Sequence, residues 1–170
     1  YMAVQYLLQN GHRRIGLIHA PLSYAANRKR YDGYIDAITE AGLRIDHTLI
    51  ISSGYEVSET VAAATKLLGA VHPPTAIFCT DDYKATGALR AALQLGIKVP
   101  EELSVMGHNN YRISELTTPP LTTVTIPMLD MGQKAGEILL RKISEPSSPV
   151  ENIFLPCQLL IRDTVKPYGK

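Results

Sequence analysis

The stretch PPTAIFCTDDYKATGALRAALQLGIKVPEELSVMGH, residues 73–108, contains two short apolar segments on either side of a helical pattern. TAIFCT (75–80) is a continuous apolar run, as expected of a strand covered on both faces, and LSVMGH (103–108) predicts the next strand. Between them, alanine and leucine at 85, 88, 89 and 92 mark one helix face that ends at Gly96. Such a unit predicts parallel strands joined by a right-handed crossover.

The same alternation of apolar strand patterns and amphipathic helix patterns precedes this stretch. A short helix is predicted at residues 3–11, and RIGLIHA (14–20) and LIIS (49–52) predict two strands, each followed by apolar residues at helical spacing. Four strand–helix units at about 30-residue spacing predict an α/β protein with a doubly wound parallel sheet and helices on both faces.

The regular alternation of strand and helix patterns ends after residue 108. LTTPPLTTVTIP (116–127) leaves room for only a short strand, because its two adjacent prolines cannot donate ladder hydrogen bonds. Apolar residues at 131, 135, 138 and 139 predict a further helix, and residues 153–165 predict a last strand interrupted at Pro156.

Composition narrows the class of protein. The chain has 170 residues, 45% of them hydrophobic, and a net charge of +1, which suits one domain with a buried core and disfavours a surface that grips nucleic acid. No apolar run approaches the roughly 20 residues that span a bilayer. Cys79 and Cys157 lie in apolar stretches and are predicted to be reduced, although the sequence leaves a disulfide open. The chain opens inside a predicted helix, so we expect its true N-terminus to lie upstream.

Polar and aromatic side chains follow each of the four predicted strands, at the sheet edge where parallel sheets bind ligands. They are, strand by strand, Tyr24, Arg28 and Arg30; Tyr55; Asp81 and Asp82; and His108, Asn109 and Asn110. Each has an ordinary explanation when taken alone: Asp82, for example, suits the N-cap of the next helix, and Asn109 suits a turn. Their convergence on one sheet edge nevertheless favours a binding site.

This set of residues is poor as an active site. The sequence has no nucleophile elbow, no glycine-rich phosphate loop and no Ser/His or Cys/His pair, and its histidines lack paired metal-ligand spacing. Asp81 and Asp82 are adjacent, so their carboxylates are expected to diverge rather than to share one acid/base or magnesium site. An arginine, an aromatic ring, a carboxylate and an amide are instead the parts of a polar-ligand clamp. We therefore predict a binding protein that needs no cofactor, and not an enzyme.

Four motifs in fixed order carry a family resemblance: GHRRI (11–15), PTAIF (74–78), VPEELSVMG (99–107) and PPLTT (119–123). With them, the chain resembles the effector-binding domain of LacI-type transcription regulators, whose fold is that of type 1 periplasmic binding proteins. The resemblance implies a cytoplasmic homodimeric repressor, not bound to membranes, whose operator-DNA affinity is controlled allosterically by a sugar-like or other polar effector. Residues 1–124 plus 156–170 would form the C-terminal subdomain of the sensor. Residues 125–155 would cross into the N-terminal subdomain, and the helix-turn-helix domain would lie outside this chain.

The resemblance also implies roles for single residues. Arg30 falls on the arginine that grips the ligand, Tyr55 on the aromatic residue that stacks on its ring, and Tyr24 in a loop that contributes a further contact. Asp81 falls on a position usually held by Asn, and Asn109 on one usually held by Asp. This exchange leads us to expect a hydrogen-bond donor or a cationic group of the ligand near Asp81. Residues 111–117 and the helix from Tyr83 resemble the dimer interface.

Two other functions stay open on the sequence alone. A periplasmic sugar-binding component of a transporter would need an upstream signal peptide, and an enzyme on a flavodoxin-like sheet would need a catalytic constellation. The helix within 125–155 has an apolar face, so in this chain we expect it to dock on a second copy, to pack elsewhere, or to be mobile.

Overall fold

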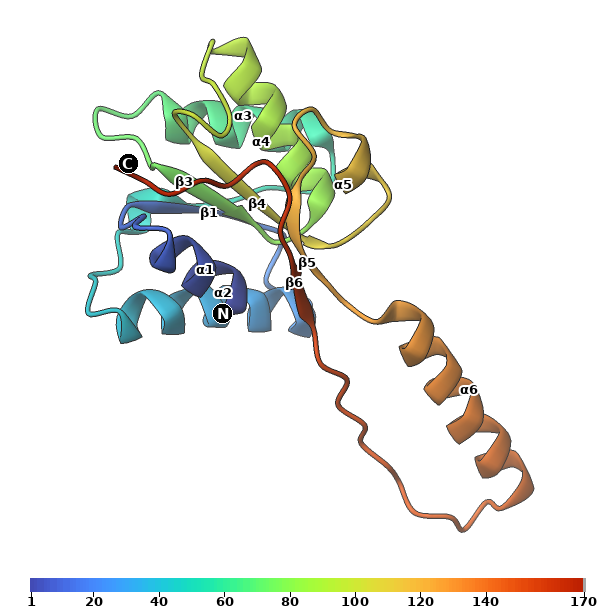
Figure 1. The fold of residues 1–170 in the computed structure, drawn as a ribbon. Coiled ribbons are helices and arrows are strands. Elements are labelled where there is room, and N and C mark those ends of the chain that lie inside the picture. Colours follow the sequence, from blue (N-terminus) through green and yellow to red (C-terminus); the bar gives the residue numbers. More distant parts are fainter. Residues whose placement is uncertain (170) are drawn as a thin grey trace.

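Six strands form a single sheet in the order β2-β1-β3-β4-β5-β6 (Figure 1). The computed structural model describes residues 1–169, and its strands are β1 (Ile15–His19), β2 (Ile50–Ser52), β3 (Ala76–Cys79), β4 (Ser104–Asn109), β5 (Thr122–Thr125) and β6 (Gln158–Leu160). The first five strands run parallel, as predicted, and β6 runs antiparallel to β5. The predicted parallel sheet is therefore confirmed, and the direction of the last strand, which the sequence left open, is antiparallel because the chain leaves β5 and returns directly beside it.

Helices cover both faces of the sheet, which confirms the doubly wound arrangement (Figure 1). They are α1 (Met2–Gln9), α2 (Ala25–Glu40), α3 (Val57–Leu68), α4 (Asp82–Gln94), the short α5 (Ile113–Leu116) and α6 (Met128–Ser144), with a 3-10 turn at His47–Leu49. The helices α1 and α2 lie on one face, and α3 and α4 lie on the other.

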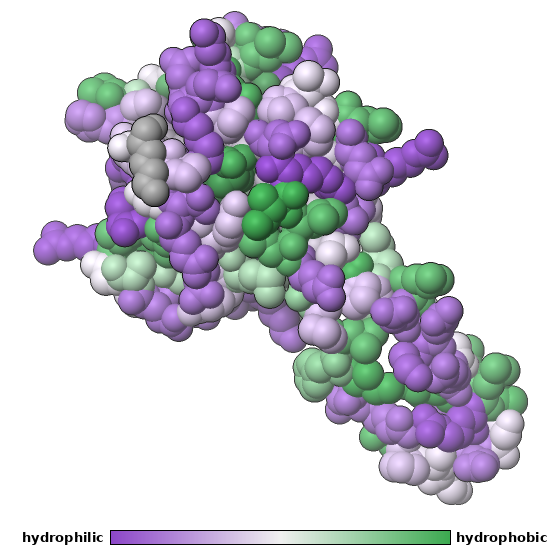
Figure 2. All heavy atoms as spheres, in the orientation of Figure 1, coloured by the Kyte–Doolittle hydropathy of each residue, from purple (hydrophilic) through white to green (hydrophobic). Residues whose placement is uncertain are grey.

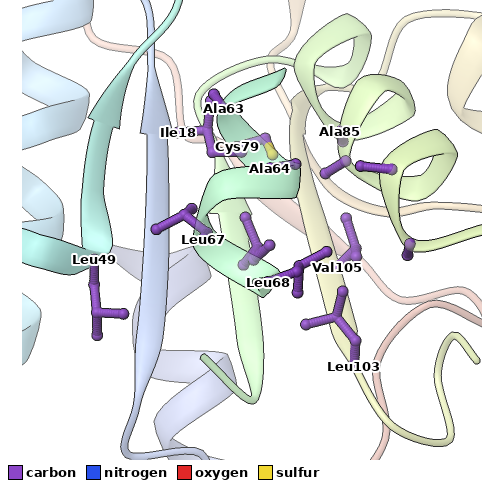
Figure 3. Close-up of a cluster of buried hydrophobic side chains, with 14 of the residues drawn as sticks. Ile18, Leu49, Ala63, Ala64, Leu67, Leu68, Cys79, Ala85, Leu103 and Val105 are labelled. Carbon is purple, nitrogen blue, oxygen red and sulfur yellow. The ribbon is translucent and has the colours of Figure 1, made fainter. Parts of the chain in front are cut away.

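Alternate residues of each central strand supply the two halves of the core. Ile18 and Cys79 pack with α3 and α4 in the cluster shown in Figure 3, whereas Leu17 and Phe78 pack with α1 and α2. Successive side chains of a strand point to opposite faces, so a strand covered on both sides must be apolar throughout. All five residues of β1 and all four of β3 are buried accordingly. Packing on both faces therefore holds the ends of these strands in place.

The helix α6 projects away from the sheet, and none of its residues is buried (Figure 1). Large apolar side chains stay exposed along it, as the hydropathy colouring shows: Met128, Leu129, Met131, Leu139, Leu140 and Ile143 (Figure 2). The expectation that this helix packs elsewhere on the chain is therefore wrong. Within residues 1–169, no helix is long and apolar enough to cross a membrane.

Candidate functional site

A cleft of about 450 Å³ lies at the carboxyl ends of the strands. Four of the five predicted ligand-binding residues line it: Arg30, Tyr55, Asp81 and Asn109. Each follows a different strand, and Arg30 and Asn109 are 79 positions apart in the sequence. The sheet brings them together because the carboxyl ends of parallel strands share one edge.

The fifth predicted residue, Tyr24, does not line this cleft. It precedes the first turn of α2, and its side chain is 61% exposed. Arg28, on the next turn, is also exposed. The backbone of Tyr24 explains the difference: Tyr24 is the N-cap of α2 and has extended dihedral angles, φ −95° and ψ 130°, so helical spacing does not align it with Asn27 and Arg30, which face the strand ends.

Arg30 spans the space between α2 and the ends of β3 and β4. Its Nη1 donates to the backbone oxygen of Thr80 at 2.8 Å, and its Nη2 donates to Oδ1 of Asn109 at 3.0 Å. Burial lowers the pKa of the guanidinium, and the nearby charge of Asp81 partly opposes this shift. The arginine is thus fixed in position and still charged at neutral pH.

Asn109 is buried, and its backbone has φ 103°, a region that residues other than glycine rarely adopt. Its Oδ1 lies 2.9 Å from Nδ1 of His108 while also accepting from Arg30. An amide oxygen only accepts hydrogen bonds, so Nδ1 of His108 carries a proton. Burial, followed by the charge of Arg30, lowers the pKa of His108 to about 4 and keeps it neutral.

The two adjacent aspartates have different roles. Asp81 ends the extended segment after β3 and caps α4, because its Oδ1 accepts the backbone N–H of Lys84 at 2.8 Å. Asp82 is therefore not the cap that the sequence suggests. Its side chain is fully buried and accepts from the hydroxyl of Thr123 and the backbone N–H of Tyr111, both at 2.6 Å. Burial raises the pKa of Asp82 to about 6.

Lys84 is a lining residue that the sequence did not indicate. Its Nζ donates to the backbone oxygen of Gly54, lies 3.6 Å from Oδ2 of Asp81 and sits 5.2 Å from the ring centroid of Tyr55. A lysine in the first turn of a helix is usually solvated, so only its place three residues after Asp81 could have signalled this contact. This lysine supplies a cation near Asp81 within the chain itself, and the expected donor or cationic group of the ligand at that carboxylate stays a prediction.

Tyr55 lines the same cleft as Arg30. It is 64% exposed, and its hydroxyl lies 3.5 Å from Nδ2 of Asn27. An exposed ring with the Lys84 cation over one face can offer a flat apolar face to a ligand. The cleft therefore combines one guanidinium, one partly engaged carboxylate, one amide and one ring. In the part of the chain that the structure describes, 1–169, no group of three His, Cys, Asp or Glu could hold a metal ion.

Comparison with known proteins identifies the family of this chain. The model of the family described as periplasmic binding protein-like domain matches residues 4–165. A solved structure of a putative transcriptional regulator LacI from Bacillus cereus subsp. cytotoxis superposes with a TM-score of 0.94 at 30% identity, covering 99% of this chain and 60% of that one. The chain belongs to the LacI family.

Curated relatives of this LacI-family domain are repressors. The HTH-type transcriptional repressor PurR of Vibrio vulnificus is 35% identical over 166 residues, which are 98% of this chain and 50% of the relative. The probable HTH-type transcriptional repressor ExuR of Bacillus subtilis is 32% identical over 96% of this chain and 49% of the relative. The chain thus spans about half the length of the curated relatives it matches, and these relatives are named as repressors.

Solved LacI-family structures include ligand complexes. The transcriptional regulator CelR in complex with cellobiose matches with a TM-score of 0.90 and 31% identity over 95% of this chain and 50% of that one. A LacI family regulator from Enterococcus faecium with bound ribose matches with a TM-score of 0.91 and 26% identity over 99% of this chain and 62% of that one.

Proposed function

We propose that this LacI-family chain is the ligand-sensing part of a cytoplasmic repressor, and that its cleft binds the small polar effector. The observation that carries the proposal is the convergence of Arg30, Tyr55, Asp81 and Asn109 on one cleft of about 450 Å³. Ligand sites of small molecules have about 300–1,000 Å³ and place a few polar groups around apolar surface. The sugars bound by the CelR and Enterococcus faecium relatives support a polar ligand of this size.

The proposal extends to how the chain is divided between subdomains. Residues 1–124 plus 156–170 would be the C-terminal subdomain, and residues 125–155 would cross into an N-terminal subdomain supplied by the rest of the protein. The exposed apolar side chains of α6 support this division, because leaving such side chains in water costs about 1.5–3 kcal/mol each. The cleft would then lie between two bodies, which the ligand bridges.

A homodimer and an operator-binding helix-turn-helix domain outside this chain complete the proposed assembly. Exposed apolar residues on α4 and α5 support self-association through these helices: Tyr83, Leu93 and Leu116. The ligand would act by shifting the population of two subdomain arrangements that differ in DNA affinity. Couplings of this kind are typically about 1–3 kcal/mol.

The cleft is tested by Arg30→Ala. Screening sugars, nucleobases and amino acids against the complete sensor by thermal shift, followed by calorimetry on each hit, identifies a ligand. Removing a charged hydrogen bond costs about 1.5–3 kcal/mol, so we expect the affinity of Arg30→Ala to fall by roughly ten- to a hundredfold. The matched control is Arg44→Ala, an exposed arginine in the loop after α2, which should bind as the wild type does. If Arg30→Ala is folded and binds the ligand as tightly as Arg44→Ala does, the cleft is not the ligand site.

A further inference from the structure

The charge of Arg30 has no partner within the structure. Arg30 forms no ion pair with any described residue, and both of its hydrogen bonds go to uncharged oxygens, those of Thr80 and Asn109. The imidazole next to it, His108, is neutral and supplies no anion. A guanidinium has five N–H donors, so three remain for water or a ligand.

The neighbouring carboxylates are engaged elsewhere. Asp81 accepts from the backbone N–H of Lys84 through Oδ1, and its Oδ2 lies 3.6 Å from the ammonium of that lysine. Asp82 is fully buried, and both of its oxygens are taken, by Thr123 and Tyr111. Neither acid can turn to Arg30 without breaking these contacts, so no described residue of this chain supplies an anion to it.

The energetics of filling the cleft then favour one class of ligand. A ligand that displaces water from Arg30 removes the hydration of a charge, which is costly unless the ligand supplies a paired group. A neutral hydroxyl restores a hydrogen bond but no opposite charge, whereas a carboxylate or phosphate restores both in a charge-assisted contact. The second oxygen of Asp81 remains an acceptor for a ligand hydroxyl, and the exposed Tyr55 ring suits the flat face of a sugar.

We infer that the effector is a hydroxylated small molecule with a carboxylate or phosphate group, and that this anionic group binds Arg30. The inference rests on the proposed function of the cleft and adds the charge of the ligand to it. Carboxylate and phosphate groups would bind Arg30 in the same way, since a guanidinium accommodates either group with two parallel hydrogen bonds.

The test is calorimetry of the complete regulator with matched probes. The probes are D-glucuronate, D-galacturonate and D-gluconate for the carboxylate arm, D-glucose 6-phosphate and D-ribose 5-phosphate for the phosphate arm, and D-glucose, D-galactose and D-ribose as neutral parents. We expect at least one acid or phosphate to bind about tenfold or more tightly than its neutral parent. A neutral parent that binds as tightly as its acid, and loses affinity in Arg30→Ala, would overturn the inference while leaving the proposed function in place. Absence of binding by all acids and phosphates would overturn it as well.

Asn109→Asp gives a second, charge-specific readout. The change is nearly isosteric and places a carboxylate beside Arg30, which should lower the affinity for the anionic ligand by about tenfold or more relative to the affinity for its neutral parent. The matched control is Asn152→Asp in the exposed loop after α6, which adds the same charge outside the cleft. Should Asn109→Asp fail to fold, Arg30→Gln removes the cation instead and should abolish the preference for the acid. Retention of the full preference in either folded variant would contradict the inference.

Discussion

Replacing Gly107 by valine should destabilise the chain by about 3 kcal/mol or more. A Cβ at this position in β4 would lie 2.3 Å from Oδ1 of Asp82 and 2.8 Å from Cδ2 of Leu121. The carboxylate cannot yield, because its hydrogen bonds to Thr123 and Tyr111 hold it between α4 and β5. The free energy of unfolding, measured by urea denaturation of the 170-residue chain, checks this expectation.

The matched control for Gly107 is a glycine with open space around it. Nothing lies within 4 Å of a Cβ built at Gly136 in α6, so Gly136→Ala should be neutral or stabilise the chain by up to about 1 kcal/mol through helix propensity. A loss below about 1 kcal/mol in Gly107→Val would show that the contact between β4 and Asp82 is looser than the structure has it.

The stability difference between the wild type and Asp82→Asn should depend on pH. The pKa of Asp82 is about 6 in the folded protein against an ordinary 3.8, so between these pH values the folded protein holds a proton that the unfolded chain has released. The wild type therefore loses stability, relative to the variant, as the pH rises from about 4 to about 7. The shift corresponds to about 3 kcal/mol.

Urea denaturation of both proteins at pH 4 and pH 7 measures this effect. His108, whose pKa is lowered to about 4, contributes stability that is lost as the pH falls from 6.5 through 4. That contribution is present in both proteins, so the difference between them isolates Asp82. A difference that is the same at both pH values would mean that burial does not perturb this carboxylate.

The sequence predicts most of the fold because hydrophobic periodicity reports burial directly. Apolar runs at 75–80 and 14–20 could only be strands covered on both faces, and β3 and β1 lie within them. The direction of β6 was not predictable in this way. A three-residue strand carries no signal of direction, which depends on where the chain returns after α6.

The sequence predicts which residues lie at the strand ends, but it does not predict where each side chain points. Convergence of Arg30 and Asn109 follows from topology alone. The division of roles between Asp81 and Asp82 depends on which residue begins the helix, a boundary that differs by one position. The inward direction of Lys84 depends on helix rotation, which apolar spacing leaves loosely defined at a helix start, and the outward direction of Tyr24 depends on its extended backbone at the N-cap of α2.

A hydrogen-bond network between the chain after β6 and the loop after β4 was also missed. Arg162, just after β6, donates to Oδ1 of Asn110 at 3.0 Å, to the hydroxyl of Ser114 at 3.1 Å and to the backbone oxygen of Leu121 at 2.9 Å. It thereby ties the returning chain to the loop that follows β4. Asn110 is thus a structural residue with positive φ rather than a second ligand contact. Contacts between residues 52 apart leave no local sequence signal.

The central claim is that a ligand in this cleft controls DNA binding by the intact regulator. Its most direct test is fluorescence anisotropy of a DNA site selected in vitro with the full-length protein, titrated with the ligand that calorimetry identifies. For Arg30→Ala, we expect DNA affinity without ligand to match the wild type and the ligand concentration at half-response to rise roughly ten- to a hundredfold. An unchanged ligand response in Arg30→Ala, with unchanged DNA affinity, would contradict the claim.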